Sequence, residues 1–226
     1  DMPCMPNKKR SKVCVDCDEY TETGKKILLI KLGAIGDVIR TTPLLNRLRT
    51  TYLDSHITWL TYFPDILPAS QINSIKKFDF KSFVCASNDH FDIAVNLDKD
   101  KEACILLAEV SANEKFGFSW SENNHIIGLS AAANKKILTG LFDDISKANS
   151  QSYQEEIFEI CGFKFEKEPS ILEVDRAYGM KWKNGFGRDR KGKIIGLNTG
   201  CGKRWPTRLW PNENWISLIG KLKEDG

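Results

Sequence analysis

The two glycines and the aspartate of Gly33-x-x-Gly36-Asp37 directly follow a short apolar run that ends at Ile30. Glycine lets a chain turn tightly and approach a ligand with its backbone, and the N–H groups at the start of a helix favour anionic or hydroxyl-rich partners. Asp37 is the acidic residue of this turn and a candidate general base. The alternative is a plain strand-to-helix turn in which Asp37 caps the helix.

Two well-known nucleotide-binding motifs do not fit this turn. A dinucleotide-binding turn has the spacing G-x-G-x-x-G and an acidic residue near the end of the second strand, whereas Asp54 precedes the second apolar run. The sequence contains no G-x-x-x-x-G-K-[ST] phosphate loop. Nicotinamide chemistry and P-loop nucleotide hydrolysis are therefore disfavoured.

A second glycine-rich turn begins at Thr199-Gly200 and leads into a basic loop with two tryptophans. The cations of this loop are Lys203, Arg204 and Arg208. Backbone N–H groups combined with Lys and Arg hold a diphosphate through charge-assisted hydrogen bonds. On composition alone, a solvated basic loop with packed tryptophans is an equal alternative. Tryptophan beside arginine can also stack on nucleic-acid bases, but a formal net charge of +3 gives that partner little support.

Three cysteines, Cys4, Cys14 and Cys17, lie close together near the start of the chain. The C-x-x-C pair is typical of tetrahedral zinc sites, and an iron–sulfur cluster is a second possibility. The alternative is a flexible tail with incidental cysteines. The remaining cysteines are scattered and are predicted to be reduced thiols, most of them packed as small apolar residues: Cys85, Cys104, Cys161 and Cys201.

Two longer segments resemble one known family. KILLIKLGAIGDVIRTTPLLNRLR, from Lys26 to Arg49, resembles the opening of bacterial lipopolysaccharide heptosyltransferases, glycosyltransferase family 9. IGLNTGCGKRWPTRLWPNENW, from Ile195 to Trp215, resembles the start of their second domain. Together the segments cover about a fifth of the chain and occur in the family's order. The family's D-[ST]-G-x-x-H segment, which holds the donor sugar, is absent, so we expect a truncated chain.

The resemblance implies a GT-B fold and inverting transfer of heptose from ADP-heptose to a lipopolysaccharide-core acceptor, without a catalytic metal. It implies that Asp37 is the base and that Gly33 and Gly36 shape its loop. The residues that it implies for the donor diphosphate are Thr199, Gly200, Lys203 and Arg208, with Arg204 as a further possible contact. The acceptor would be a lipid-linked saccharide, reached by peripheral contact at the inner face of the cytoplasmic membrane, with no nucleic-acid partner.

Composition agrees with a globular protein of this kind. A content of 41% hydrophobic and 28% charged residues is ordinary for a chain with a buried core. We find no apolar run of the length that spans a bilayer and no secretory signal, and therefore expect a cytoplasmic protein. A noncatalytic, metal-stabilised module that binds nucleic acid is the alternative function.

The elements that must position these residues alternate between strand and helix, which predicts a doubly wound parallel sheet. Strands are expected at 27–30, 57–62, 91–97, 115–120 and 193–198, and helices at 38–52, 101–110, 151–161 and 213–223. Pro43 is expected either to start a helix or to kink one, and Gly162 to follow a helix end. We predict a Cys-containing segment at 1–24, a Rossmann-like acceptor domain at 25–188, and the start of a nucleotide-sugar domain at 189–226.

Overall fold

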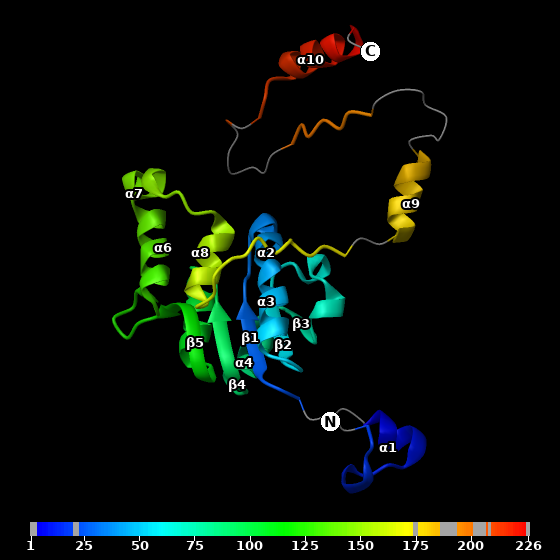
Figure 1. Cartoon of the computed structure of the whole chain (residues 1–226), viewed down its shortest axis with the longest axis vertical. Helices are drawn as coiled ribbons and strands as arrows, with labels where there is room; N and C mark the ends of the chain where they lie inside the picture. Colours follow the sequence, from blue (N-terminus) through cyan, green and yellow to red (C-terminus); the bar gives the residue numbers. More distant parts are fainter. Residues whose placement is uncertain are drawn as a thin grey trace. The chain divides into compact units, whose positions relative to one another are not determined.

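The computed structural model describes residues 4–19, 23–173, 176–185, 194–200, 207 and 209–224. The chain divides into two units, Asp1–Glu173 and Val174–Gly226. The predicted domain ranges stay predictions. Figure 1 shows the elements of both units.

A six-stranded sheet forms the centre of the first unit, with the strand order β3-β2-β1-β4-β5-β6. All neighbouring strands are parallel except β5 and β6, which are antiparallel. The predicted α/β class with a mostly parallel sheet is therefore confirmed. The strands are β1 Lys26–Ile30, β2 His56–Thr61, β3 Ser74–Lys77, β4 His90–Asn96, β5 Ser111–Trp120 and β6 Ile126–Gly128.

Helices cover both faces of the sheet, as a doubly wound fold requires. The side chains of β1 alternate between two apolar clusters. The helices α2, α3, α6 and α8 contribute to one cluster, α4 contributes to the other, and α5 contributes to both. The helices of the first unit are α1 Met5–Arg10, α2 Ile35–Thr41, α3 Pro43–Thr51, α4 Phe80–Ser87, α5 Lys101–Glu109, α6 Ala131–Leu141, α7 Asp143–Ala148 and α8 Tyr153–Ile160. Short 3₁₀ turns lie at η1 Cys14–Asp16, η2 Pro64–Ile66 and η3 Ala69–Gln71.

Local signals explain where two of these helices begin and end. Pro43 is the first residue of α3, a position that needs no N–H donor, so the expectation that it starts a helix is confirmed. Ser152 caps α8 in a reciprocal pair with Glu155. Gly162 follows α8 with a φ of +75°, and the N–H of Phe163 bonds to the carbonyl oxygen of Phe158 at 2.8 Å, which completes a Schellman end.

Other elements differ from the sequence-based expectation. Strand β3 was not predicted because Ser74–Lys77 is a polar edge strand without an apolar alternation. Strand β5 begins at Ser111 rather than 115, because its first half is polar and largely exposed. In the second unit, α10 Asn212–Glu224 confirms the predicted helix, whereas α9 Arg176–Gly185 was not predicted. Residues 194–200 form no strand, and no described residue pairs with them in a ladder.

One glycine is required by the close approach of two central strands. Gly117 of β5 pairs with Asn96 of β4 and has a φ of +99°. A Cβ atom at this position would lie 1.7 Å from the carbonyl oxygen of Asn96.

We predict that Gly117→Ala lowers the free energy of unfolding by about 2–4 kcal/mol, because it combines an unfavourable φ with overpacking. Urea denaturation measures the effect. Gly36→Ala is the matched control, since its Cβ would meet no atom within 4 Å and alanine favours a helix. A Gly117→Ala protein as stable as the control would contradict the close approach of β4 and β5.

Candidate functional site

The candidate site lies where the strand order of the sheet reverses. Strands β1 and β4 are adjacent, and the chain winds away from them in opposite directions. Open α/β sheets bind ligands at the carboxyl ends of such a strand pair. The loop after β1 carries Gly33 and leads into α2 with Asp37, and the loop after β4 carries Asp98.

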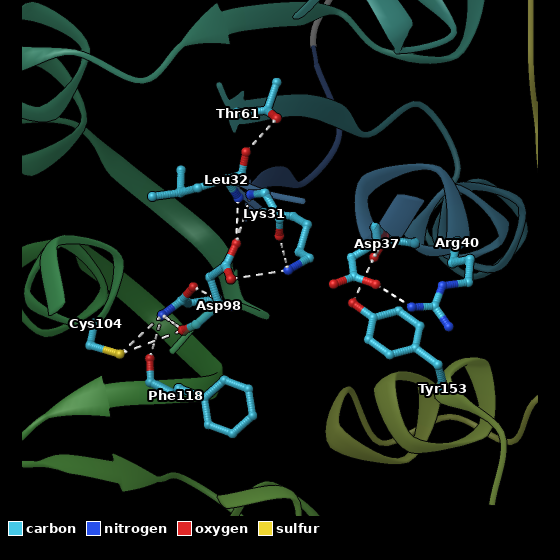
Figure 2. Close-up of polar contacts among 12 residues, drawn as sticks. Lys31, Leu32, Asp37, Arg40, Thr61, Asp98, Cys104, Phe118 and Tyr153 are labelled. Atoms are coloured by element: carbon cyan, nitrogen blue, oxygen red, sulfur yellow. Dashed lines mark hydrogen bonds and ion pairs between the residues drawn. The ribbon is translucent and has the colours of Figure 1, made fainter. Parts of the chain in front are cut away.

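A buried ion pair joins these two loops. The ammonium of Lys31 lies 3.0 Å from the carboxylate of Asp98, and their side chains are only 5% and 13% exposed. The same carboxylate accepts hydrogen bonds from the backbone N–H of Leu32 at 2.6 Å and of Gly33 at 3.1 Å. Lys31 also donates to the carbonyl oxygen of Gly33 at 2.5 Å. Figure 2 shows the Asp98 carboxylate facing Lys31 and Leu32.

The buried side-chain amide of Asn96 supports the turn that carries Asp98. The side chain of Asn96 donates to the carbonyl oxygens of Asp98 at 2.9 Å and of Phe118 at 2.7 Å. Its amide oxygen accepts the N–H of Asp98 at 2.9 Å. Asn96 therefore fixes the turn after β4 to strand β5, and every polar atom of its fully buried side chain is satisfied.

Asp37 lies at the third position of α2, and its side chain is 33% exposed. Its carboxylate forms an ion pair with Arg40, and its carbonyl oxygen accepts the Thr41 hydroxyl at 2.8 Å. The guanidinium of Arg40 lies 4.4 Å from the ring centroid of Tyr153 in α8. Burial, joined by the nearby charge of Asp37, raises the pKa of Tyr153, so the phenol is neutral. Figure 2 shows Arg40 beside the carboxylate of Asp37 and the ring of Tyr153.

The helix-cap interpretation of Asp37 is wrong for this structure. The N-cap of α2 is Ala34, and no side-chain capping bond is present. The side chain of Asp37 pairs instead with Arg40 in the same helix. Its position in the first turn is still favourable, because the helix dipole stabilises a negative charge there.

Neither predicted loop glycine is required by a positive φ. The described glycines with positive φ are Gly117 and Gly162. A Cβ at Gly33 would lie 3.6 Å from the Phe63 ring, which is an ordinary contact, and a Cβ at Gly36 would meet no atom within 4 Å. The loop after β1 therefore does not need glycine at either position for a positive φ or for a close backbone contact.

Further titratable groups follow β4. The pKa of Lys99 is lowered by burial first and then by the charge of Lys136. The pKa of Asp100 is raised by burial first and then by the charges of Asp98 and Glu102. Sequence reasoning missed this cluster, although an acidic residue directly after an apolar strand is the same signal that identified Asp37.

A pocket of about 400 Å³ elsewhere in the first unit includes neither Asp37 nor Asp98. It lies between α4 and the strands β2 and β3, with apolar residues on its floor and exposed lysines around it. Because it contains none of the groups at the strand reversal, we assign it no part in the candidate site.

The predicted donor residues belong to the second unit. Thr199 and Gly200 lie in an irregular segment, where the N–H of Gly200 approaches the side-chain oxygen of Asn198 at 3.4 Å. Lys203, Arg204 and Arg208 lie outside the described residues. The diphosphate site therefore stays a prediction.

The cysteine predictions have different outcomes. Cys4, Cys14 and Cys17 are free thiols, and the described residues contain no group of three or more His, Cys, Asp or Glu placed to hold a metal ion. The zinc or iron–sulfur site stays a prediction. Burial raises the pKa of Cys104 to about 12 and that of Cys161 to about 12, which agrees with packed thiols. Cys85 is exposed, so the packing prediction is wrong there, and Cys201 lies outside the described residues.

Comparison with known proteins identifies a shared fold. No protein-family model matches the chain, and no curated protein sequence matches it significantly. A solved family 9 glycosyl transferase from Veillonella parvula matches with a TM-score of 0.61 and 19% identity, over 88% of this chain and 61% of that one. The ADP-heptose lipopolysaccharide heptosyltransferase II of E. coli matches with a TM-score of 0.56 and 16% identity, over 89% and 62%.

These matches confirm the expected resemblance in fold to family 9 glycosyltransferases and the predicted GT-B-type class. The chain spans about three-fifths of the length of either solved protein. At these identities, the likeness concerns the fold alone.

We predict that Asp98→Ala lowers the free energy of unfolding by about 3–5 kcal/mol, because it leaves the buried Lys31 ammonium without its partner. Chemical denaturation measures this loss. Glu114→Ala is the matched control: it removes the partner of Lys25 from a pair with a 3.7 Å contact and side chains 45% and 51% exposed, and should cost about 0–1 kcal/mol. Equal effects of the two substitutions would show that Asp98 does not hold the loop.

Proposed function

We propose that the protein is an inverting glycosyltransferase that transfers heptose, or a related sugar, from ADP-heptose to a lipid-linked saccharide of the lipopolysaccharide core. The carrying observation is the partly exposed carboxylate of Asp37, which lies at the strand reversal of a sheet whose fold matches two sugar-transferring proteins. Gly36, the residue before Asp37, is exposed as well.

Asp37 would act as the general base of this reaction. An acceptor hydroxyl oxygen attacks the anomeric carbon of the donor, the bond from that carbon to the ADP oxygen breaks, and the hydroxyl proton passes to the Asp37 carboxylate. Inversion follows when the attacking oxygen and the departing diphosphate lie on opposite faces of the sugar. A carboxylate is a weak base, so the proton moves late, when the new C–O bond has largely formed.

The basic loop of the second unit would hold the donor. Thr199 and Gly200 would offer backbone N–H groups, while Lys203, Arg204 and Arg208 would neutralise the diphosphate as it departs. A lipid-linked acceptor would place the reaction at the cytoplasmic face of the inner membrane, reached by peripheral contact. Among the described residues, no helix combines the length and apolar character needed to cross a membrane.

We predict that Asp37→Asn lowers the transferase turnover of the intact protein by about 10²–10⁴-fold, the usual loss for a general base. Asparagine keeps the shape of the side chain but cannot take the proton. Steady-state turnover with ADP-heptose measures the effect, and the melting temperature and the affinity for ADP should stay at the parent values. Near-normal turnover in Asp37→Asn would remove Asp37 from the mechanism.

We predict that Lys203→Ala or Arg208→Ala weakens ADP binding by about ten- to a hundredfold, the loss of one charge-assisted contact. Titration calorimetry with ADP measures the affinity. Lys221→Ala is the matched control, because it removes an exposed cation of α10 outside the loop. ADP affinities equal to that of the control would show that the loop is only a basic surface.

A thermal-shift measurement on the same protein distinguishes the transferase from the alternative function. A ligand that binds only the folded state raises the melting temperature. ADP or ADP-heptose should raise it for a transferase. A rise with an oligonucleotide, and none with ADP, would favour the nucleic-acid-binding module.

A further inference from the structure

Three side chains from α2 and α8 form one connected group around the candidate base. Asp37 and Arg40 are one helical turn apart, so their side chains share a face of α2 and form an ion pair. Arg40 uses Nη2 to contact Oδ1 of Asp37. No described residue donates a hydrogen bond to the second oxygen, Oδ2. One oxygen of the carboxylate is thus held and the other is available to a solute.

An exposed ion pair alone would not fix the carboxylate. Such pairs contribute little to stability, because two flexible side chains must be held in one geometry. Here the guanidinium also lies over the ring of Tyr153, with its central carbon 4.4 Å from the ring centroid, and this cation–π contact restrains it. The ring therefore limits the positions from which Arg40 can reach Asp37.

Tyr153 is itself anchored in the first unit. Its side chain packs against the apolar cluster formed by the sheet with α3 and α8. Its hydroxyl lies 3.4 Å from the hydroxyl of Thr41, and the Lys136 ammonium lies 5.6 Å from the centroid of its ring. A series of contacts therefore extends from the core through Tyr153 and Arg40 to the carboxylate, and Figure 2 shows these three side chains close together.

We propose that Arg40 and Tyr153 are positioning residues, which hold Oδ1 of Asp37 and thereby direct Oδ2 toward the acceptor hydroxyl. This inference rests on the proposed function. Arginine suits this role because its planar guanidinium can pair through its edge with a carboxylate while its face lies against an aromatic ring. A lysine ammonium cannot do both. Orientation of this kind matters because misplacement by about 1 Å can reduce a rate about 10²-fold.

The test compares the turnover of the intact protein with that of variants of this group. Arg40→Ala should lower kcat by about 10- to 100-fold while KM for the donor stays within about twofold, since Arg40 acts on the base and not on the donor. Added guanidinium ion at millimolar concentration should restore part of the lost kcat in Arg40→Ala but leave the parent unchanged. A purely structural loss would not be rescued in this way.

Substitutions of the tyrosine separate its ring from its hydroxyl. Tyr153→Phe keeps the stacking face and should retain kcat within about threefold, whereas Tyr153→Leu removes the face and should lower kcat about tenfold, as should Arg40→Lys. A crystal structure of Arg40→Ala should show the Asp37 carboxylate turned from its present orientation.

Arg47→Ala is the matched control. Arg47 also pairs with carboxylates in the first unit, Glu166 and Glu168, but it does not contact Asp37. Its loss should lower the melting temperature without changing kcat at temperatures where the protein stays folded.

Distinct results would overturn the inference. Parental kcat in Arg40→Ala, or equal losses in Tyr153→Phe and Tyr153→Leu, would overturn the positioning role while leaving the transferase proposal intact. A rise in acceptor KM alone would also overturn it, since Arg40 would then be a substrate contact. A parent protein that transfers no sugar from ADP-heptose or a related donor would overturn the proposed function, and this inference with it.

Discussion

The candidate site depends on one buried ion pair, between Lys31 and Asp98. Taking two charges out of water is costly, and the cost is offset only when each charge also finds hydrogen-bonding partners. The Asp98 carboxylate meets this condition with two backbone N–H groups and the Lys31 ammonium. Because these partners all belong to the loop after β1, the contact that satisfies Asp98 also defines the path of the chain toward Asp37.

Two levels of support therefore meet at the carboxyl ends of β1 and β4. The ion pair between Lys31 and Asp98 is buried and fixes the backbone of the loop after β1. The contact between Arg40 and Tyr153 is partly exposed and acts on the side chain of Asp37. Burial favours rigidity in the ion pair, whereas exposure leaves the group around Asp37 accessible to a substrate. This division suits a proposed base that must be held in place and still meet a large acceptor.

Local features of the sequence predicted the fold and made Asp37 a candidate, because they are encoded within a few residues. The continuous apolar run of β1 and the glycines after it identify a central strand and its turn without any distant contact. The contacts of Lys31 with Asp98 and of Arg40 with Tyr153 could not be found in this way. Asp98 reaches the loop across 66 positions, and nothing local marks Lys31 as buried. The expected strand at 193–198 relied on its own apolar residues, but a strand also needs a neighbour.

The pairing of α2 with α8 has a consequence for the order in which the protein is made. The hydroxyls of Thr41 and Tyr153 meet across 112 positions of the chain. A ribosome that has just completed α2 has therefore produced the proposed base and Arg40, but the supporting ring of Tyr153 is synthesised only after β5, β6 and α6. Contacts so distant along the chain form late in folding. The arrangement around Asp37 is thus absent from any nascent chain that ends before Tyr153.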